Sequence, residues 1–268
     1  MKRNRLFWAV LLILMGTLFL AGNLGLISVN VWSLFWPVFL ILVGIWYLWG
    51  STRGGTEIPP EQDSIPLEGA ERAKIRLKHG GGKLRVSGGA GPDVLASGSF
   101  AGGVDSRVQS TGSSLDVVLK PDRHAFPDLF LPWNWTSRTG LSWDLSLSEA
   151  VDLDLTLETG ASETELYLRD LQVKNLILKT GASATSVVLP EGAGLTTVRV
   201  EAGAASVKLE VPEHTAARIE AEAGLASIEI NEERFPRAGS GYQSPHYQDA
   251  DHKIDLKVQT GLGSIVIR

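Results

Sequence analysis

The sequence predicts a helical hairpin in a membrane, followed by an all-β repeat domain. From Leu6 to Thr52 the chain contains no Asp, Glu, Lys, Arg or His and consists mostly of Leu, Ile, Val, Phe and Trp. From Val151 onward, a small-residue motif centred on glycine recurs between stretches in which apolar and polar residues alternate. The first pattern is typical of segments that span a bilayer. The second is typical of strands that stack as structural repeats.

The uncharged run divides into two apolar stretches, Leu6–Ala21 and Trp32–Trp49, joined by a short connection rich in Gly and Asn. Backbone that crosses lipid must satisfy its own hydrogen bonds, so both stretches are expected to be helices. The alternative is a cleaved signal peptide followed by one anchor helix. Ala21 and Gly22 make a poor cleavage site, and a second apolar stretch follows at once.

Tryptophans and basic residues predict how the hairpin lies in the cell membrane. Five tryptophans fall near the expected helix ends, where an indole with one wet edge is favoured: Trp8, Trp32, Trp36, Trp46 and Trp49. Basic residues occur before the first helix and at Arg53 after the second, whereas the connection has none. By the positive-inside rule, residues 1–53 form a two-helix, multi-pass anchor with both termini in the cytoplasm.

The composition excludes several classes of function. The chain after residue 53 holds 21 of the 25 Lys and Arg residues and all 30 Asp and Glu residues, a net charge of −9 (21 − 30). An acidic soluble part argues against nucleic acid as a partner and against adsorption of this part to anionic lipid, so contact with the bilayer is expected from the anchor alone. The absence of cysteine excludes disulfides, thiol catalysis and Cys-type zinc sites.

The remainder is expected to contain a linker and two β regions. Residues 54–66 are rich in Gly, Pro and acidic residues without a period, which predicts a flexible tether. Residues 67–150 are assigned to an N-terminal β region that carries an aromatic insertion. Residues 151–268 contain the clearest repeats.

Each repeat has a corner of small residues, such as Thr159–Ser162, with apolar residues three and five positions before its glycine. Successive corner glycines lie 21, 22, 21 and 37 residues apart, and the last gap is one period plus an insertion of about 16 residues, Phe235–Asp251. An earlier copy fits at Gly80, and Thr111 reads as a degenerate copy. The predicted structural corners are Gly80, Gly160, Gly181, Gly203, Gly224 and Gly261.

Two all-β folds fit this repeat. Two strands and a tight corner in 21 residues suit one coil of a parallel β-solenoid, in which only small side chains fit at the stacked corners. A meander of hairpins, or a β-sandwich, would show the same alternation. We favour the solenoid because a meander does not require so constant a period.

Several segments resemble a known family. Asn23–Ser28, Trp32 and Phe35–Pro37 look like the membrane domain of LiaF/LiaI-type envelope-stress proteins. Ile65–Ala73 and Gly80–Val86 resemble the opening of the toast-rack β domain, associated with the response to cell-wall-active antibiotics, that follows this anchor. The resemblance implies a bacterial regulator, because LiaF-like proteins restrain a membrane histidine kinase. It implies no catalytic residues.

No catalytic, cofactor-binding or metal-binding residues are predicted from the sequence. The run His79–Lys83 lacks the spacing and the Ser/Thr of a phosphate loop, and strand residues follow it. The one compact group of possible metal ligands is His246, Asp249, Asp251 and His252, and its spacing matches no zinc or calcium loop. We therefore expect a non-enzymatic protein and interpret these four residues as part of a solvated surface loop.

The insertion Lys120–Ser142 interrupts the repeat with aromatic residues among prolines. Its aromatic rings either cap an open end of the fold or contact a partner, since tryptophans are frequent at interface hot spots. The residues proposed for a partner contact are Phe130, Trp133, Trp135 and Trp143.

The sequence therefore predicts a membrane-anchored regulator or sensor in cell-envelope stress signalling, similar to LiaF-type modulators of a histidine kinase. The alternative is a membrane-associated β-solenoid scaffold that assembles with its own copies through open ends. The expected partners are the lipid bilayer and either a membrane histidine kinase or a second copy.

Overall fold

The computed structural model describes residues 36–37, 40, 44, 60–122 and 142–268. The chain forms two compact units, Met1–Gly55 and Thr56–Arg268. In the first unit Trp36, Pro37, Leu40 and Gly44 are helical, and the remainder of the predicted hairpin lies outside the described residues. Among the described residues, no helix has the length and apolar character needed to cross a membrane.

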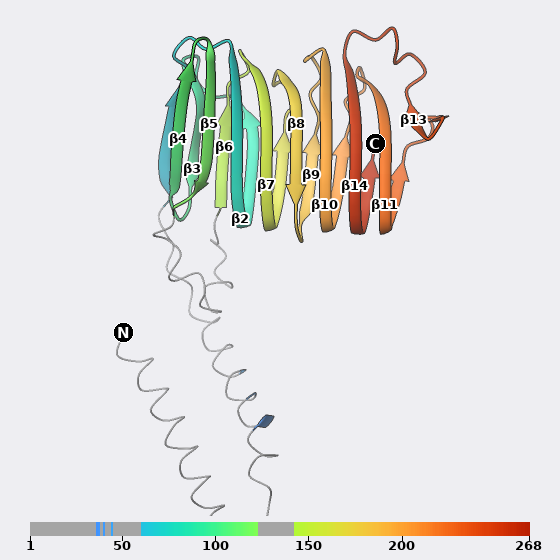
Figure 1. The fold of residues 1–268 in the computed structure, drawn as a ribbon, viewed down its shortest axis with the longest axis horizontal. Helices are drawn as coiled ribbons and strands as arrows, with labels where there is room; N and C mark the ends of the chain where they lie inside the picture. The colour runs from blue at the N-terminus through green and yellow to red at the C-terminus, as the bar shows by residue number, and fades with distance from the viewer. Residues whose placement is uncertain (1–35, 38–39, 41–43, 45–59, 123–141) are drawn as a thin grey trace, which may run out of the picture. The chain divides into compact units, whose positions relative to one another are not determined.

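The second unit is all-β (Figure 1). Within the described residues, its strands in chain order are β1 (Glu61–Pro66), β2 (Arg72–Gly88), β3 (Val94–Phe100), β4 (Val104–Thr111), β5 (Ser114–Pro121), β6 (Ser142–Leu147), β7 (Asp152–Tyr167), β8 (Val173–Thr180), β9 (Ala184–Val188), β10 (Leu195–Glu210), β11 (Ala216–Ile230), β12 (Arg237–Ala238), β13 (Gly241–Gln243) and β14 (Lys253–Ile267).

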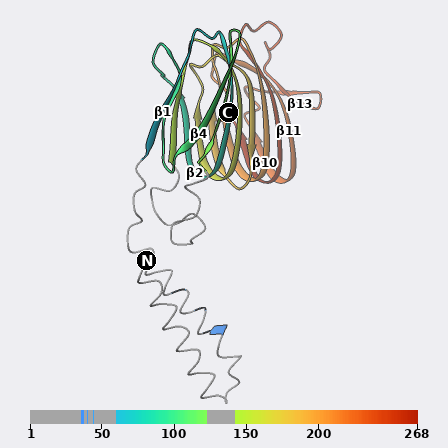
Figure 2. The same ribbon diagram turned by 60° about the vertical axis from the view of Figure 1, so that its left-hand side comes forward.

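Each coil of this domain has two arms that meet at a glycine. In β7 the arm before Gly160 pairs in parallel with β8, and the arm after it pairs in parallel with β9. The long strands β10, β11 and β14 bend in the same way and pair in parallel over both arms. Figure 2 shows the coils stacked one behind another. The predicted parallel repeat is confirmed, whereas a hairpin meander would pair its arms antiparallel.

The core lies between the two arms of the coils and runs along the whole stack. In the arm before Gly160, Leu153, Leu155 and Leu157 point inward and are buried, while the residues between them are partly exposed. The equivalent positions of the next coils are also buried: Leu176, Leu178, Val198, Val200, Leu256 and Val258. Each buried aliphatic side chain stabilises the fold by roughly 1.5–3 kcal/mol, so the stacking of coils supplies the stability that a single coil lacks.

The coils are not stacked in chain order. The C-terminal strand β14 lies between β10 and β11 and pairs with both over their whole length. The insertion Phe235–Asp251 carries β12 and β13 and returns the chain to this position. The parallel register from Leu195–Lys253 to Leu209–Ile267 shows that β14 continues the repeat of β10 as closely as a sequential coil would.

The N-terminal end of the stack departs from the predicted repeat. β5 and β6 lie along the two arms of β2 and together form one coil beside it. The predicted corner at Thr111 is wrong, because Thr111 pairs with Ser114 at the tip of an antiparallel hairpin formed by β4 and β5. The segment expected to be a linker is also shorter than predicted, since Glu61–Pro66 forms β1 and pairs with β3.

The two predicted β regions form one continuous stack. β2, from residues 67–150, pairs with β7, from residues 151–268, over the register Arg72–Asp152 to Val86–Leu166. The described residues from 60 onward therefore belong to a single solenoid with one hydrophobic core.

Candidate interaction surface at the glycine edge

The corner glycines form a row along one edge of the solenoid, here called the glycine edge: Gly80, Gly160, Gly181, Gly203, Gly261 and Gly224 in order of stacking. A β-carbon on Gly160 would lie 2.2 Å from the carbonyl oxygen of Gly80. On each later glycine of the row, a β-carbon would lie 2.9–3.1 Å from the carbonyl oxygen of a neighbouring corner glycine. The coils approach so closely here that the backbone leaves no room for a side chain.

Hydroxyl groups fill the interior behind the glycine edge. Thr159 Oγ1 donates to Thr180 Oγ1 at 3.1 Å, and Thr180 in turn shares a short hydrogen bond with Ser183. Ser162 and Thr164 share a hydrogen bond within β7, the strand that also carries Thr159. These buried hydroxyls satisfy one another, which is required where the fold excludes water.

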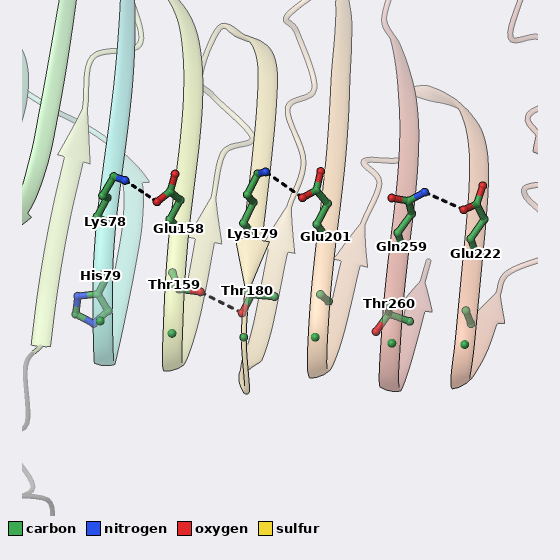
Figure 3. A pocket seen from close by; sticks show the side chains of 18 of the residues that line it. Lys78, His79, Glu158, Thr159, Lys179, Thr180, Glu201, Glu222, Gln259 and Thr260 are labelled. Carbon is green, nitrogen blue, oxygen red and sulfur yellow. Dashed lines mark hydrogen bonds and ion pairs between the residues drawn. The ribbon is translucent and has the colours of Figure 1, made fainter.

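Outside the glycine edge, charged side chains form a row across the coils (Figure 3). Lys78 Nζ lies 2.8 Å from Glu158 Oε2, and Lys179 Nζ lies 3.0 Å from Glu201 Oε2. The row ends where Gln259 Nε2 donates to Glu222 Oε2 at 2.8 Å. These pairs are about half exposed, and exposed pairs contribute at most about 1 kcal/mol each, so the row sets the charge pattern of the surface more than its stability.

A groove of about 1140 Å³ runs between this charged row and the glycine edge. Glycines and the inward-facing residues beside them line its floor, and Lys120 and Pro121 line it at the end of β5. The aromatic insertion leaves β5 at this point and returns at Ser142, which pairs with Lys83 just beyond Gly80. The groove and the two ends of the insertion therefore share the same edge of the domain.

On the arm after the corner, a second charge cluster links β2 to β7. Glu165 accepts two hydrogen bonds from Arg85, at 2.9 and 3.1 Å, and lies 3.3 Å from Lys83 Nζ. The hydrogen bonds from Arg85 and then from Lys83 lower the pKa of Glu165. The pKa of Lys83 is raised, chiefly by its hydrogen bond to the same carboxylate.

His79, beside the first corner, is buried and touches the ring of Trp143, with 5.2 Å between ring centroids. Neither its two ring nitrogens nor the indole nitrogen of Trp143 has a hydrogen-bond partner among the described residues. Burial lowers the pKa of His79 to about 4. The histidine is therefore neutral at physiological pH and behaves as a core residue.

Trp143 is not part of an exposed contact surface, which corrects one predicted contact residue. It is 1% exposed, faces inward from β6 and packs edge to face against Phe100 at 5.1 Å. Because β6 is an arm of a coil, the alternation of the strand places this ring in the core. The other predicted contact residues, Phe130, Trp133 and Trp135, lie outside the described residues.

The remaining sequence-predicted sites are placed as follows. Of the tryptophans expected at the membrane interface, Trp36 is helical and exposed, and Trp8, Trp32, Trp46 and Trp49 lie outside the described residues. In the described part of the chain, no group of three or more His, Asp or Glu residues is arranged to hold a metal ion. His252 instead accepts a hydrogen bond from the backbone of Gly194 through Nδ1.

The sequence did not reveal that the last coil is only half covered. Phe235, which follows β11, is fully buried, and β13 pairs with Arg218 and Ile219 on the arm of β11 before the corner. Beyond Ile219, the edge of β11 that faces away from β14 pairs with no strand in the described residues. Leu225 at the corner is 84% exposed and Ile228 is 36% exposed. The apolar residues Leu225 and Ile228 could have indicated this open edge from the sequence. They do so only if β11 is known to be the last coil, which the sequence does not show.

Two models of known families match the chain. Residues 54–210 match the model of the toast-rack N-terminal domain, DUF2154, and residues 6–48 match that of the LiaI-LiaF-like transmembrane region. The first match covers more than half of the chain, so the chain belongs to the toast-rack family, as the resemblance predicted. The second match identifies it as a membrane protein with a LiaF-like transmembrane region.

One solved structure shows the same fold. A proposed cell adhesion protein from Clostridium sporogenes ATCC 15579 is similar with a TM-score of 0.67 and 20% identity, over 78% of this chain and 98% of its own. A proposed adhesin from Bacteroides fragilis NCTC 9343 aligns over 80% of this chain and 100% of its own, with a TM-score of 0.29 and 8% identity. No curated protein matches the chain.

Proposed function

We propose that this protein is a non-enzymatic regulator in cell-envelope stress signalling that acts on a membrane histidine kinase. The observation that carries the proposal is the presence in one chain of a LiaI-LiaF-like transmembrane region and a toast-rack domain. The described domain offers extended faces and a long groove, which suit contact with another protein.

The two parts of the chain divide this role. The apolar hairpin, with both termini in the cytoplasm, pairs with the membrane helices of the kinase or responds to the bilayer. The solenoid holds a segment of the kinase outside the membrane. Binding to one state of the kinase and not to the other would shift its activity, because a regulator acts only through such a difference in affinity.

Deleting the gene tests the proposal. The transcriptional response to envelope stress is measured with and without a cell-wall-active antibiotic, in the deletion strain and in the same strain complemented with the full chain. We expect the deletion to change the basal or the induced response and complementation to restore it. A response that is unchanged in both conditions would rule out the regulatory role.

The aromatic insertion is proposed as part of the kinase contact, through Phe130, Trp133 and Trp135. Changing Trp133 and Trp135 together to Ser separates this role from capping. A contact surface predicts unchanged thermal unfolding and an altered stress response. Lower stability with a normal response at permissive temperature would instead assign the rings to a cap.

The second candidate is a scaffold that assembles through the ends of the solenoid. The open edge of β11 favours it, because unpaired strand edges associate with other strands. The opposite end argues against it, since β1 carries Glu61, Asp63 and Pro66 and would meet an edge that is itself acidic. Sedimentation of the full chain in detergent over a concentration series separates the two: growing assemblies support the scaffold, and a constant size removes it.

A further inference from the structure

The open part of β11, Glu222–Glu229, is the least covered strand edge around the corner of the last coil. We propose that this edge accepts an extended, basic segment of a partner protein as an added β-strand. The inference deepens the proposed function by naming the surface and the chemistry of the partner segment, and it rests on that function only for the partner's identity.

The covering of the last coil stops short of this segment. The pairing of β13 with Arg218 and Ile219 protects the arm before the corner. Tyr247 covers the same arm, because its ring lies under the Arg218 guanidinium at 4.4 Å and its hydroxyl donates to Asp255 at 2.5 Å. From Glu220 onward, β11 pairs only with β14 within the described residues. In Figure 1, β13 lies beside the upper part of this end of the stack, and β11 extends below it.

The backbone of this segment presents unpaired donors and acceptors. Asn231 donates its N–H to Ile267 of β14. Because successive residues of a strand direct their N–H and C=O groups to opposite sides, those of Ile228 and Ala226 point away from β14. These are the groups that an added strand pairs with, and main-chain pairing of this kind supplies most of the affinity in strand addition.

Apolar side chains of the same segment of β11 are exposed to solvent. Ile228 is equivalent to Ile265 and Val207, which are 1% exposed in the coils that follow one another inside the stack. In the last coil this position is 36% exposed. Leu225 lies beside Leu262 on the outer side of the corner, where the two side chains are 84% and 50% exposed. A strand laid along β11 would cover Ile228, as each internal coil covers its neighbour, and would cover Leu225 in part, since Leu262 is 50% exposed with strands on both sides.

The charge pattern identifies the partner segment as basic. Across the coils, acidic side chains face Lys78 and Lys179 on adjacent strands. The row ends at Glu222, whose cationic neighbour among the described residues is Lys257 of β14 at 3.7 Å, a lysine that it shares with Glu220 at 3.6 Å. On the other arm, Glu229 has no ion-pair partner among the described residues. A strand added next to β11 would lie beside both glutamates, and Lys or Arg directly opposite a carboxylate stabilises a strand pair.

A second copy of the chain fits this edge poorly. Two copies that meet through β11 would bring the same glutamates together. A copy stacked in the same direction would place β1, with Glu61 and Asp63, against the arm that carries Glu229. Its β4 would meet the arm that β13 already covers. A partner of opposite charge avoids each of these conflicts.

The test uses the full chain in nanodiscs of neutral phosphatidylcholine, so that a basic peptide gains nothing from the lipid. The probe is a fluorescent peptide of about eight residues, within the usual length of a strand, with the sequence Lys-Val-Gly-Ala-Val-Lys-Val-Lys. Its Gly-Ala pair matches the corner of β11, so that lysines lie opposite Glu222 and Glu229 while the valines face inward. Its binding is measured by fluorescence anisotropy. A scrambled peptide of the same composition and a glutamate–valine peptide serve as controls. We expect saturable binding of the lysine–valine peptide and at least tenfold weaker binding of both controls.

Three changes locate the site. E222Q/E229Q removes the proposed charges, and E213Q is its matched control at an exposed glutamate outside the strands. A226P removes one open-edge donor, which edge strands tolerate. We expect the double variant and A226P each to weaken binding at least tenfold, and E213Q to leave it unchanged. If A226P fails to fold, a peptide with N-methylated amides on its pairing side replaces it and should bind at least tenfold more weakly.

Equal binding to wild type, E222Q/E229Q and A226P would overturn the proposal, as would equal binding of the scrambled peptide. A concentration-dependent dimer that A226P dissolves would also overturn it and assign the edge to a second copy. None of these outcomes alters the deletion experiment on the stress response, so a failure here is distinct from a failure of the proposed function.

Discussion

The carbonyl oxygen of Gly80 lies 2.2 Å from the point that a β-carbon on Gly160 would occupy. Real β-carbons do not approach an oxygen this closely, so glycine at position 160 is a condition for stacking β7 on β2. At Gly80 itself a β-carbon would meet nothing within 4 Å. Two glycines at the same place in the motif therefore differ sharply in how strictly the fold requires them.

This difference gives the first prediction. G160A forces β7 and β2 apart or strains both backbones, and we expect it to lower the free energy of unfolding by about 3 kcal/mol, at the upper end of overpacking costs. G80A should change it by less than about 1 kcal/mol in either direction. Chemical denaturation of the full chain in detergent measures both. Equal losses would show that the corners are not packed as described.

The hydroxyl ladder behind the corners gives the second prediction. T180V keeps the shape of the side chain but removes the group that bonds to both Thr159 and Ser183. Leaving buried hydroxyls without partners costs about 1–3 kcal/mol, so we expect a loss in this range. T197V is the matched control, because Thr197 is exposed on the outer face of β10. Similar thermal unfolding of the two variants would contradict the ladder's contribution.

The third prediction concerns pH. Burial lowers the pKa of His79 to about 4 in the folded state, whereas the unfolded chain has the ordinary value of 6.5. As the pH falls below 6.5, the unfolded state binds the proton first, and stability is lost until about pH 4. A shift of this size corresponds to a loss of at most about 3 kcal/mol.

H79L removes this titration without introducing a charge. We expect its unfolding free energy to fall less between pH 6.5 and 4 than that of the wild type, as measured by denaturation at each pH. Parallel pH profiles for the two proteins would show that His79 is already protonated or accessible to water in the folded state.

The sequence was sufficient to predict which residues face inward but not the order of the coils. Alternation around each glycine fixes the inner and outer side chains, because a one-residue slip would expose Leu155 and Leu157. The same alternation is shared by every coil. The register of β10 on β14 is therefore as favourable as that of β10 on a sequential β11, and the sequence does not distinguish them.

The candidate surfaces likewise include features that the sequence predicts and one that it does not. The corner glycines were identifiable because their spacing is regular, and the charged row follows from the residue two places before each glycine. The open edge of β11 was not identifiable, since Leu225 and Ile228 occupy positions equivalent to Leu262 and Ile265. Their exposure depends on the coil order and on how far β13 extends along β11.

The last prediction concerns Trp143, whose assignment changed from a contact surface to the core. Its ring packs against Phe100 and His79 and is 1% exposed. W143A should lower the free energy of unfolding by about 3–5 kcal/mol, the usual cost of removing a large buried ring. Y167A is the control, because Tyr167 lies on the outer face of β7 and is 48% exposed, so its loss should cost far less.

A second readout of the same variant separates packing from surface contact. Removing the indole admits water beside His79, so its pKa should rise from about 4 toward 6.5. Titration of the His79 ring by NMR measures this change, with Y167A again as the control. If W143A left both the stability and the titration of His79 unchanged, Trp143 would lie at the surface, and the aromatic contact first expected from the sequence would regain its fourth residue.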